Sequence, residues 1–334
     1  MIHAACRFVY KLSLIAALAV CTLVATSAAQ GQSSAAFPEK PIKLIVPYAP
    51  GGSADFTARL IAQKMSEGLR QPLVVDNKPG ANGIIGADVV AKAAPDGYTL
   101  LLAPRELGIN PSIYATLPYD TLKSFAWIGL ATEGHFVMVV NPSIPAQSFA
   151  DLIALAKAKP ASLSYGSIGI GSIAQLNVEA LKQRQGVDIL HVPYKGAGPA
   201  LNATVSGEVA LTIAAVPGAI GFIKDGRLRA LAVGSPTRLP QFPDVPTLGE
   251  VGGGADTFVT TFFGLAAPAN TPEPIIAKLN AELRRAVTHP DIVEKLNASG
   301  LVPIGSTPEV MASTIADDIA RFGTLVKSIG IKPE

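Results

Sequence analysis

The segment Pro47–Asp55 contains residue types that can bind an anion through the main chain. It reads Pro-Tyr-Ala-Pro-Gly-Gly-Ser-Ala-Asp and lies between a predicted strand and a predicted helix. Glycine lets a backbone approach a ligand closely, and the first N–H groups of a helix have no partner within the helix. These donors and the helix dipole favour a carboxylate without a side-chain cation, although an ordinary strand-to-helix turn would have the same composition. The residues that we expect to contact a ligand here are Tyr48, Ala49, Gly51, Gly52, Ser53 and Asp55.

A second segment, Tyr165–Ser172, repeats this pattern where another predicted strand runs into a helix. Its sequence, Tyr-Gly-Ser-Ile-Gly-Ile-Gly-Ser, again combines glycines with hydroxyl groups. If the two segments belong to two domains, they would face each other across a cleft and bind an acid between two helix N-termini. The expected ligand-binding residues of this segment are Ser167, Gly169, Gly171 and Ser172.

The second segment also fits the dinucleotide-binding pattern G-x-G-x-x-A, over Gly169–Ala174. That pattern requires an acidic residue at the end of the following strand, whereas Asp188 stands at its start. The histidines that follow residue 36 lack metal-ligand spacing, and the sequence contains no nucleophile motif with a base beside it. We therefore predict no cofactor, no metal and no catalytic residue.

Segments typical of strands and helices alternate along the chain after residue 36. Predicted strands cover 42–46, 73–75, 98–102, 136–140, 163–165, 188–192, 209–213 and 228–233. Predicted helices cover 53–68, 84–94, 148–159, 172–185, 272–288, 290–298 and 307–329. Strands separated by helices predict βαβ units, mainly parallel sheets and an α/β fold.

The length of 334 residues exceeds what one hydrophobic core usually organises, so we expect two domains. Prolines and glycines mark two candidate crossings between domains, near residues 141–145 and within 236–255. Domain 1 would then comprise residues 37–140 and 259–334, and domain 2 residues 141–258. The two crossover strands would serve as a hinge for a cleft between the domains.

The N-terminus predicts a cleavable signal peptide, over residues 1–36. Arg7 and Lys11 precede an apolar stretch, Leu12–Val24, and small residues follow it. Export to the periplasm is the favoured interpretation, and a retained membrane anchor is the alternative. The formal net charge is only +2 and no Lys/Arg cluster occurs, which argues against nucleic acid as a partner.

Three segments carry a resemblance to a known family: Pro47–Asp55, Gly166–Ser172 and His191–Ala200. With matching stretches elsewhere over residues 37–330, the chain resembles the Bug family. These TctC-type proteins are the extracytoplasmic solute-binding proteins of tripartite tricarboxylate transporters. The resemblance implies a type II periplasmic-binding-protein-like fold, a monomer that closes on a small carboxylate, and delivery to membrane transporter subunits. A sensor that docks onto a signalling receptor, or an exported enzyme on this scaffold, are the alternatives.

Departures from the family pattern bear on the choice of ligand. Gln175 stands where many relatives carry a histidine, and Ala214 and the alanine after it replace an Asp-Asn pair. Arg105 could pair with a carboxylate, or could instead face solvent or pair with Glu106. Phe263 could form an apolar wall or belong to the core. Unsatisfied polar groups are costly to bury, so these losses favour an apolar or aromatic monocarboxylate over a di- or tricarboxylate.

Overall fold

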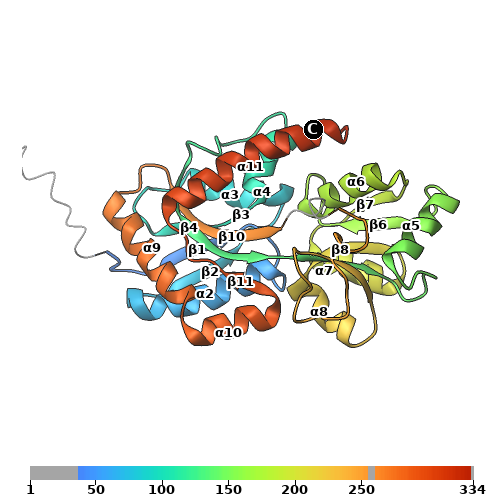
Figure 1. Cartoon of the computed structure of the whole chain (residues 1–334). Coiled ribbons are helices and arrows are strands. Elements are labelled where there is room, and N and C mark those ends of the chain that lie inside the picture. Colours follow the sequence, from blue (N-terminus) through green and yellow to red (C-terminus); the bar gives the residue numbers. More distant parts are fainter. Residues whose placement is uncertain (1–36, 255–259, 332–334) are drawn as a thin grey trace, which may run out of the picture. The chain divides into compact units, whose positions relative to one another are not determined.

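The computed structural model describes residues 37–254 and 260–331, and the predicted signal peptide lies outside them. From Pro38 onward the chain counts as one unit by its internal contacts, and Figure 1 labels its helices and strands. The strands are β1 (Ile42–Val46), β2 (Leu73–Asn77), β3 (Thr99–Pro104), β4 (Phe125–Gly134), β5 (Phe136–Val140), β6 (Ser164–Ser167), β7 (Leu190–Pro193), β8 (Leu211–Ala215), β9 (Arg229–Gly234), β10 (Thr261–Pro268) and β11 (Leu301–Pro303). The helices are α2 (Ser53–Leu69), the short η2 (Ala81–Gly83), α3 (Ile84–Ala91), α4 (Glu106–Ile113), α5 (Phe149–Ala158), α6 (Ile173–Gln185), α7 (Ala197–Ser206), α8 (Val216–Lys224), α9 (Glu273–Val287), α10 (Pro290–Ser299) and α11 (Pro308–Ser328).

The first sheet has the strand order β11-β4-β10-β3-β1-β2. Its centre is buried because β1 and β3 are runs of Leu, Ile, Val and Ala side chains, most of which are fully inaccessible. β1 pairs in parallel with both β2 and β3, so the segments that follow β1 and β3 emerge at the same edge. Helices α3, α4 and α11 pack on one face of this sheet, through a cluster that includes Ile84, Leu107 and Ile315.

The second sheet has the strand order β7-β6-β8-β5-β9. β6 is parallel to β7 and β8, whereas β5 is antiparallel to β8 and β9. In the first sheet, β10 likewise runs antiparallel to β3 and β4. The expectation of mainly parallel sheets is therefore wrong. The strands joined by helical crossovers are parallel, but the strands that carry the chain between the sheets enter in the opposite direction.

The chain passes from the first sheet to the second at His135, between β4 and β5. This position precedes the predicted crossing near residues 141–145, because residues 136–140 pair with β8 and β9. The return passage lies between the end of β9 and the start of β10, and residues 255–259 within it lie outside the described residues. The division into two domains at 140/141 and 258/259 stays a prediction.

The helices that sequence patterns did not predict include α4 and α7. Both contain residues that disfavour helix: Gly108 and Pro111 in α4, and Gly198 and Pro199 in α7. Pro199 stands in the first turn of α7, where a missing N–H removes no helical hydrogen bond. Both helices contribute lining residues to the pocket described next.

Candidate functional site

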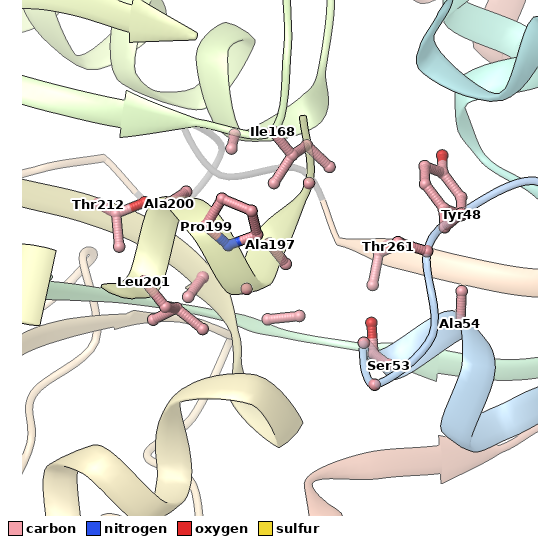
Figure 2. Close-up of a pocket in the computed structure, with 18 of the residues that line it drawn as sticks. Tyr48, Ser53, Ala54, Ile168, Ala197, Pro199, Ala200, Leu201, Thr212 and Thr261 are labelled. Carbon is pink, nitrogen blue, oxygen red and sulfur yellow. The ribbon is translucent and has the colours of Figure 1, made fainter. Parts of the chain in front are cut away.

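A pocket of about 310 Å³ lies between elements of the first and second sheets. The β1–α2 loop and β10 contribute one side, and α7, β8 and the end of β6 contribute the other (Figure 2). Its lining residues are Tyr48, Ala49, Pro50, Gly51, Gly52, Ser53, Ala54, Glu106, Phe136, Ile168, Ala174, Gly196, Ala197, Gly198, Pro199, Ala200, Leu201, Thr212, Ile213, Ala214, Ala215, Thr261 and Phe263.

The β1–α2 loop presents the N-terminus of α2 to this pocket. Gly51 adopts φ +90°, a conformation that favours glycine, and Gly52 is the extended residue that precedes the helix. A Cβ atom added at Gly51 or Gly52 would meet nothing within 4 Å, so both glycines border open space. The N–H groups of the first helical turn have no partner within α2, and the helix dipole makes this end favourable for an anion.

Asp55, which we expected to contact the ligand, is not among the residues that line the pocket. Its side chain instead stabilises the conformation of the β1–α2 loop. Its carboxylate accepts hydrogen bonds from Gly51 N at 3.2 Å, Arg59 Nε at 2.9 Å and Asn77 Nδ2 at 3.1 Å. Burial alone would raise the pKa of Asp55, but these hydrogen bonds lower it below its usual value. Asp55 is therefore an anion that orders the loop. Because Gly51 N donates to it, the donors left for a ligand are those further along, at the start of α2.

The start of α7 forms the opposite wall of the pocket. Figure 2 shows Ala197, Pro199 and Ala200 on the other side of the pocket from Ser53 and Ala54. The sequence analysis did not predict that the start of α7 contributes to the ligand site, although a glycine-rich segment precedes and begins this helix. Lys195-Gly196-Ala197-Gly198-Pro199 begins one residue after the end of β7 and is glycine-rich like the β1–α2 loop.

The second glycine segment has a different environment from the one expected. Of its residues only Ile168 lines the pocket, whereas Ser167, Gly169, Gly171 and Ser172 do not, nor does Gln175. Gln175 Oε1 accepts from Gly171 N at 2.7 Å, and Ser172 Oγ donates to Gly169 O at 2.7 Å. A Cβ atom on Gly171 would lie 2.6 Å from the Ile113 side chain of α4. The segment thus packs against α4 and satisfies its own polar groups.

His191 on β7 completes the hydrogen-bond network of this second segment. Its Nε2 lies 2.6 Å from Ser167 Oγ, and its Nδ1 lies 3.3 Å from Gln175 Nε2. Since Ser167 Oγ donates to Gly169 O at 3.1 Å, we assign the ring proton to Nε2 and the acceptor role to Nδ1. Burial lowers the pKa of His191, consistent with a neutral ring. The pair has the residue types of a nucleophile and its base, but Ser167 is fully buried and is not among the residues that line the pocket.

Arg105 and Glu106, at the start of α4, have unlike positions. Arg105 is 9% exposed, its Nε lies 3.3 Å from Asp318 Oδ2 of α11, and its guanidinium lies over the Phe262 ring. It neither faces solvent nor lines the pocket. Glu106 does line the pocket and is 4% exposed. Burial raises the pKa of Glu106, although its own backbone N–H at the start of α4, the Tyr48 hydroxyl and Arg105 favour its charged form.

The rest of the lining is mainly apolar. Phe136, Phe263, Ile168 and Leu201 form walls, and the predicted residue Ala214 lies among them. None of the described lining residues is a lysine, arginine or histidine. Across the described residues, no cluster of His, Cys, Asp and Glu could hold a metal ion. The same residues include no helix that is both long and apolar enough to cross a membrane. The arrangement can hold an anionic group on main-chain donors and an apolar body on the walls.

Comparisons with known proteins agree with this architecture. The family model described as "Tripartite tricarboxylate transporter family receptor" matches residues 57–331. Protein BugT of Bordetella pertussis is 38% identical over 303 residues, which cover 90% of this chain and 92% of BugT. An R. palustris protein with adipate has a TM-score of 0.86 at 34% identity, over 89% of this chain and 100% of that one. MatC of Rhodopseudomonas palustris, with bound malate, has a TM-score of 0.81 at 33% identity, over 87% and 100% of the two chains.

These matches confirm the resemblance to the Bug family and the predicted α/β fold of a periplasmic binding protein. They also agree with the prediction of a solute-binding protein rather than an enzyme, since the matching family and the similar solved structures are those of solute-binding proteins. The family model and BugT both extend over most of the described residues, so the likeness is not confined to one motif. This chain belongs to the tripartite tricarboxylate transporter receptor family.

Proposed function

We propose that this protein captures a small carboxylate in the pocket and delivers it to the membrane subunits of a tripartite tricarboxylate-type transporter. The observation that carries the proposal is the N-terminus of α2, which borders open space in a pocket whose described lining has no basic side chain. Such a site binds an acid through fixed main-chain donors. Two solved relatives hold dicarboxylic acids, adipate and malate, which supports the same ligand chemistry here.

Export by a cleavable signal peptide of residues 1–36 places the working protein in the periplasm as a monomer. Domain 1 (37–140 and 259–334) and domain 2 (141–258) close on the ligand about the two passages between the sheets. The α2 end lies in the first of these domains and the α7 wall in the second. Closure then brings both walls onto one ligand, and the transporter recognises the closed form.

The carboxylate proposal is tested by a thermal-shift screen of the purified protein with hexanoate, benzoate, adipate, malate and citrate. A ligand that binds only the folded state raises its stability, by about 2.7 kcal/mol at a concentration of 100 Kd. We expect at least one acid to raise the melting temperature and to be recovered unchanged. Stabilisation by no acid would contradict the proposal, and consumption of the acid would indicate an enzyme.

Delivery to a transporter is tested in cells. Deletion of the gene should abolish uptake of the labelled acid identified in the screen, and the restored gene should return it. Normal uptake together with a lost transcriptional response to the acid would instead indicate a sensor that docks onto a signalling receptor.

The mainly apolar walls favour a monocarboxylate with an apolar or aromatic body. Removing such a body from water stabilises the complex by about 25 cal/mol for each Å² of apolar surface buried. Calorimetry should therefore give tighter binding of benzoate than of citrate. Equal or tighter binding of citrate would contradict this choice of ligand class while leaving carboxylate capture in place.

A further inference from the structure

Glu106 is the one carboxylic acid among the described residues that line the pocket. It is the first residue of α4, directly after β3, and β3 pairs in parallel with β1. The segments that follow two adjacent parallel strands emerge at the same edge of the sheet. Glu106 and the N-terminus of α2 therefore belong to segments at the same edge of the first sheet, and both border the pocket.

The groups around Glu106 do not supply it with a free cation. Arg105, its neighbour in sequence, is engaged with Asp318 of α11 and with the ring of Phe262. Asp318 carries a like charge, which disfavours an ionised Glu106. Tyr48 of the β1–α2 loop faces the carboxyl with its buried hydroxyl. η2, which also packs on α4, consists of Ala, Asn and Gly and has no ionisable side chain.

An ionised Glu106 would meet a bound carboxylate as a second negative charge in a site shielded from water. Two carboxylates that share such a site do not both stay ionised, because the like charges repel and neither is solvated. A carboxylic acid that keeps its proton can instead donate a hydrogen bond to a carboxylate oxygen, and such charge-assisted bonds are among the stronger ones.

We propose that Glu106 acts as a neutral acid in the pocket and donates a hydrogen bond to a carboxylate of the ligand, while the apolar walls surround the rest of the ligand. This inference rests on the proposed function, since it concerns the same pocket. It adds a specificity-determining side chain to a site otherwise built from main-chain donors and apolar walls.

The proposal has a definite dependence on pH. Burial raises the pKa of Glu106 in the free protein, and an anion bound beside it raises that pKa further. Between these two pKa values the complex holds more protons than the free protein, so binding takes up protons. Affinity then falls as the pH rises through this range, by at most about tenfold per pH unit.

Three probes with the same six-carbon body separate the roles open to Glu106. Hexanoate ends in a methyl group, adipate in a second carboxylate, and 6-aminohexanoate in an ammonium group. If Glu106 is neutral and binds the shared carboxylate, the other end of each probe meets only apolar walls, so hexanoate should bind at least about tenfold more tightly than either of the others. A Glu106 that instead serves as the counter-ion of a cationic ligand predicts tighter binding of 6-aminohexanoate.

The experiment is calorimetry of the purified protein with these probes, from about pH 5 to about pH 9, in buffers of different ionisation enthalpy. In the unmodified protein we expect proton uptake on hexanoate binding and an affinity that falls with rising pH. Glu106→Gln keeps the shape and a donor but cannot ionise, so its affinity should be flat over this range. Glu67→Gln, an exposed acid further along α2, is the matched control and should behave as the unmodified protein.

Each outcome decides something. If malate or adipate binds but hexanoate does not, or if Glu106→Gln binds hexanoate with the same pH dependence and proton uptake as the unmodified protein, the role of Glu106 is refuted and carboxylate capture stands. If no acid binds, the proposed function and this inference fall together. If Glu106→Gln does not fold, as judged by its circular dichroism, the proton uptake and probe order of the unmodified protein still decide the question.

Discussion

The two glycine-rich segments that follow β1 and β6 have similar sequences and opposite environments. At Gly51 and Gly52 an added Cβ atom would enter open space at the pocket. At Gly171 it would lie 2.6 Å from the buried Ile113 side chain. The first segment leaves the N-terminus of α2 available to a ligand, whereas the second uses its polar groups on itself, on His191 and on Gln175. Glycine therefore has two uses here, access for a ligand in one segment and close packing in the other.

The largest effect on the free energy of unfolding should come from adding a methyl group at Gly171, in the segment that follows β6. Gly171→Ala places a Cβ atom against the branched, buried Ile113 at φ +73°, so we expect a loss of about 3 kcal/mol in the free energy of unfolding. Gly186→Ala is the matched control, because Gly186 has φ +63° but an added Cβ atom would meet nothing within 4 Å. It should lose only about 1 kcal/mol, from the backbone alone. Equal losses on urea denaturation would show that Ile113 does not limit the segment.

The reverse pattern is expected at the open segment. Gly52 has φ −87° and ψ 176°, which any residue adopts, so Gly52→Val should change the free energy of unfolding by less than about 0.5 kcal/mol. Its side chain would occupy the space beside the start of α2 and weaken carboxylate binding by about 2 kcal/mol, or about 30-fold. Calorimetry measures the effect, and Gly52→Ala should give a smaller loss. Retained affinity in the valine variant would remove this segment from the ligand site.

A substitution at Ser172 tests whether its hydroxyl caps helix α6 or contacts the ligand. Its hydroxyl accepts from Gln175 N at 3.4 Å at the start of α6, so Ser172→Ala should lose about 1 kcal/mol of stability and bind carboxylates unchanged. Thr307→Ala removes the comparable cap of α11, far along the chain, and should lose a similar amount. Weaker binding in Ser172→Ala without a loss of stability would instead place Ser172 among the ligand contacts predicted from sequence.

The smallest expected effect is a pH dependence confined to the packed segment. Burial lowers the pKa of His191 in the folded state, so the unfolded chain binds more protons in weakly acidic solution. Stability is then complete above the unfolded pKa of about 6.5 and falls as the pH drops through the folded value. Urea denaturation between about pH 5 and pH 7 should show this slope, and His191→Gln should flatten it.

Local patterns were sufficient to predict the first half of the site. Ile42–Val46, the glycine turn and the amphipathic helix after it are contiguous, so the strand, the loop and the exposed helix end follow from one stretch of sequence. The α7 wall was missed because Gly198 and Pro199 argue against a helix unless they stand in its first turn. No neighbouring residue indicates that placement.

The other half of the candidate site depends on contacts between segments that are far apart in the sequence. The second glycine segment packs inward because Ile113 and Asn82 meet Gly171 across the fold, and no periodicity within Tyr165–Ser172 reports these partners. Arg105 was the more obvious candidate for a carboxylate site than the acid beside it. Its position depends on Asp318, a residue of the C-terminal helix. Sequence patterns therefore identified the residue types of the site more reliably than their orientation.

Helix α11 has a mechanical consequence for ligand entry. Met311 and Ile315, in its first half, pack in the cluster beside the first sheet, whereas Phe322 and Val326, near its end, belong to the core of the second sheet. Gln183 of α6 also donates to Ser328 O at 3.2 Å. One continuous helix is thus anchored in two cores. Any motion that separates the two sheets to admit a solute must bend this helix or detach its last turns. Helix α11 therefore limits how far the two sheets can move apart.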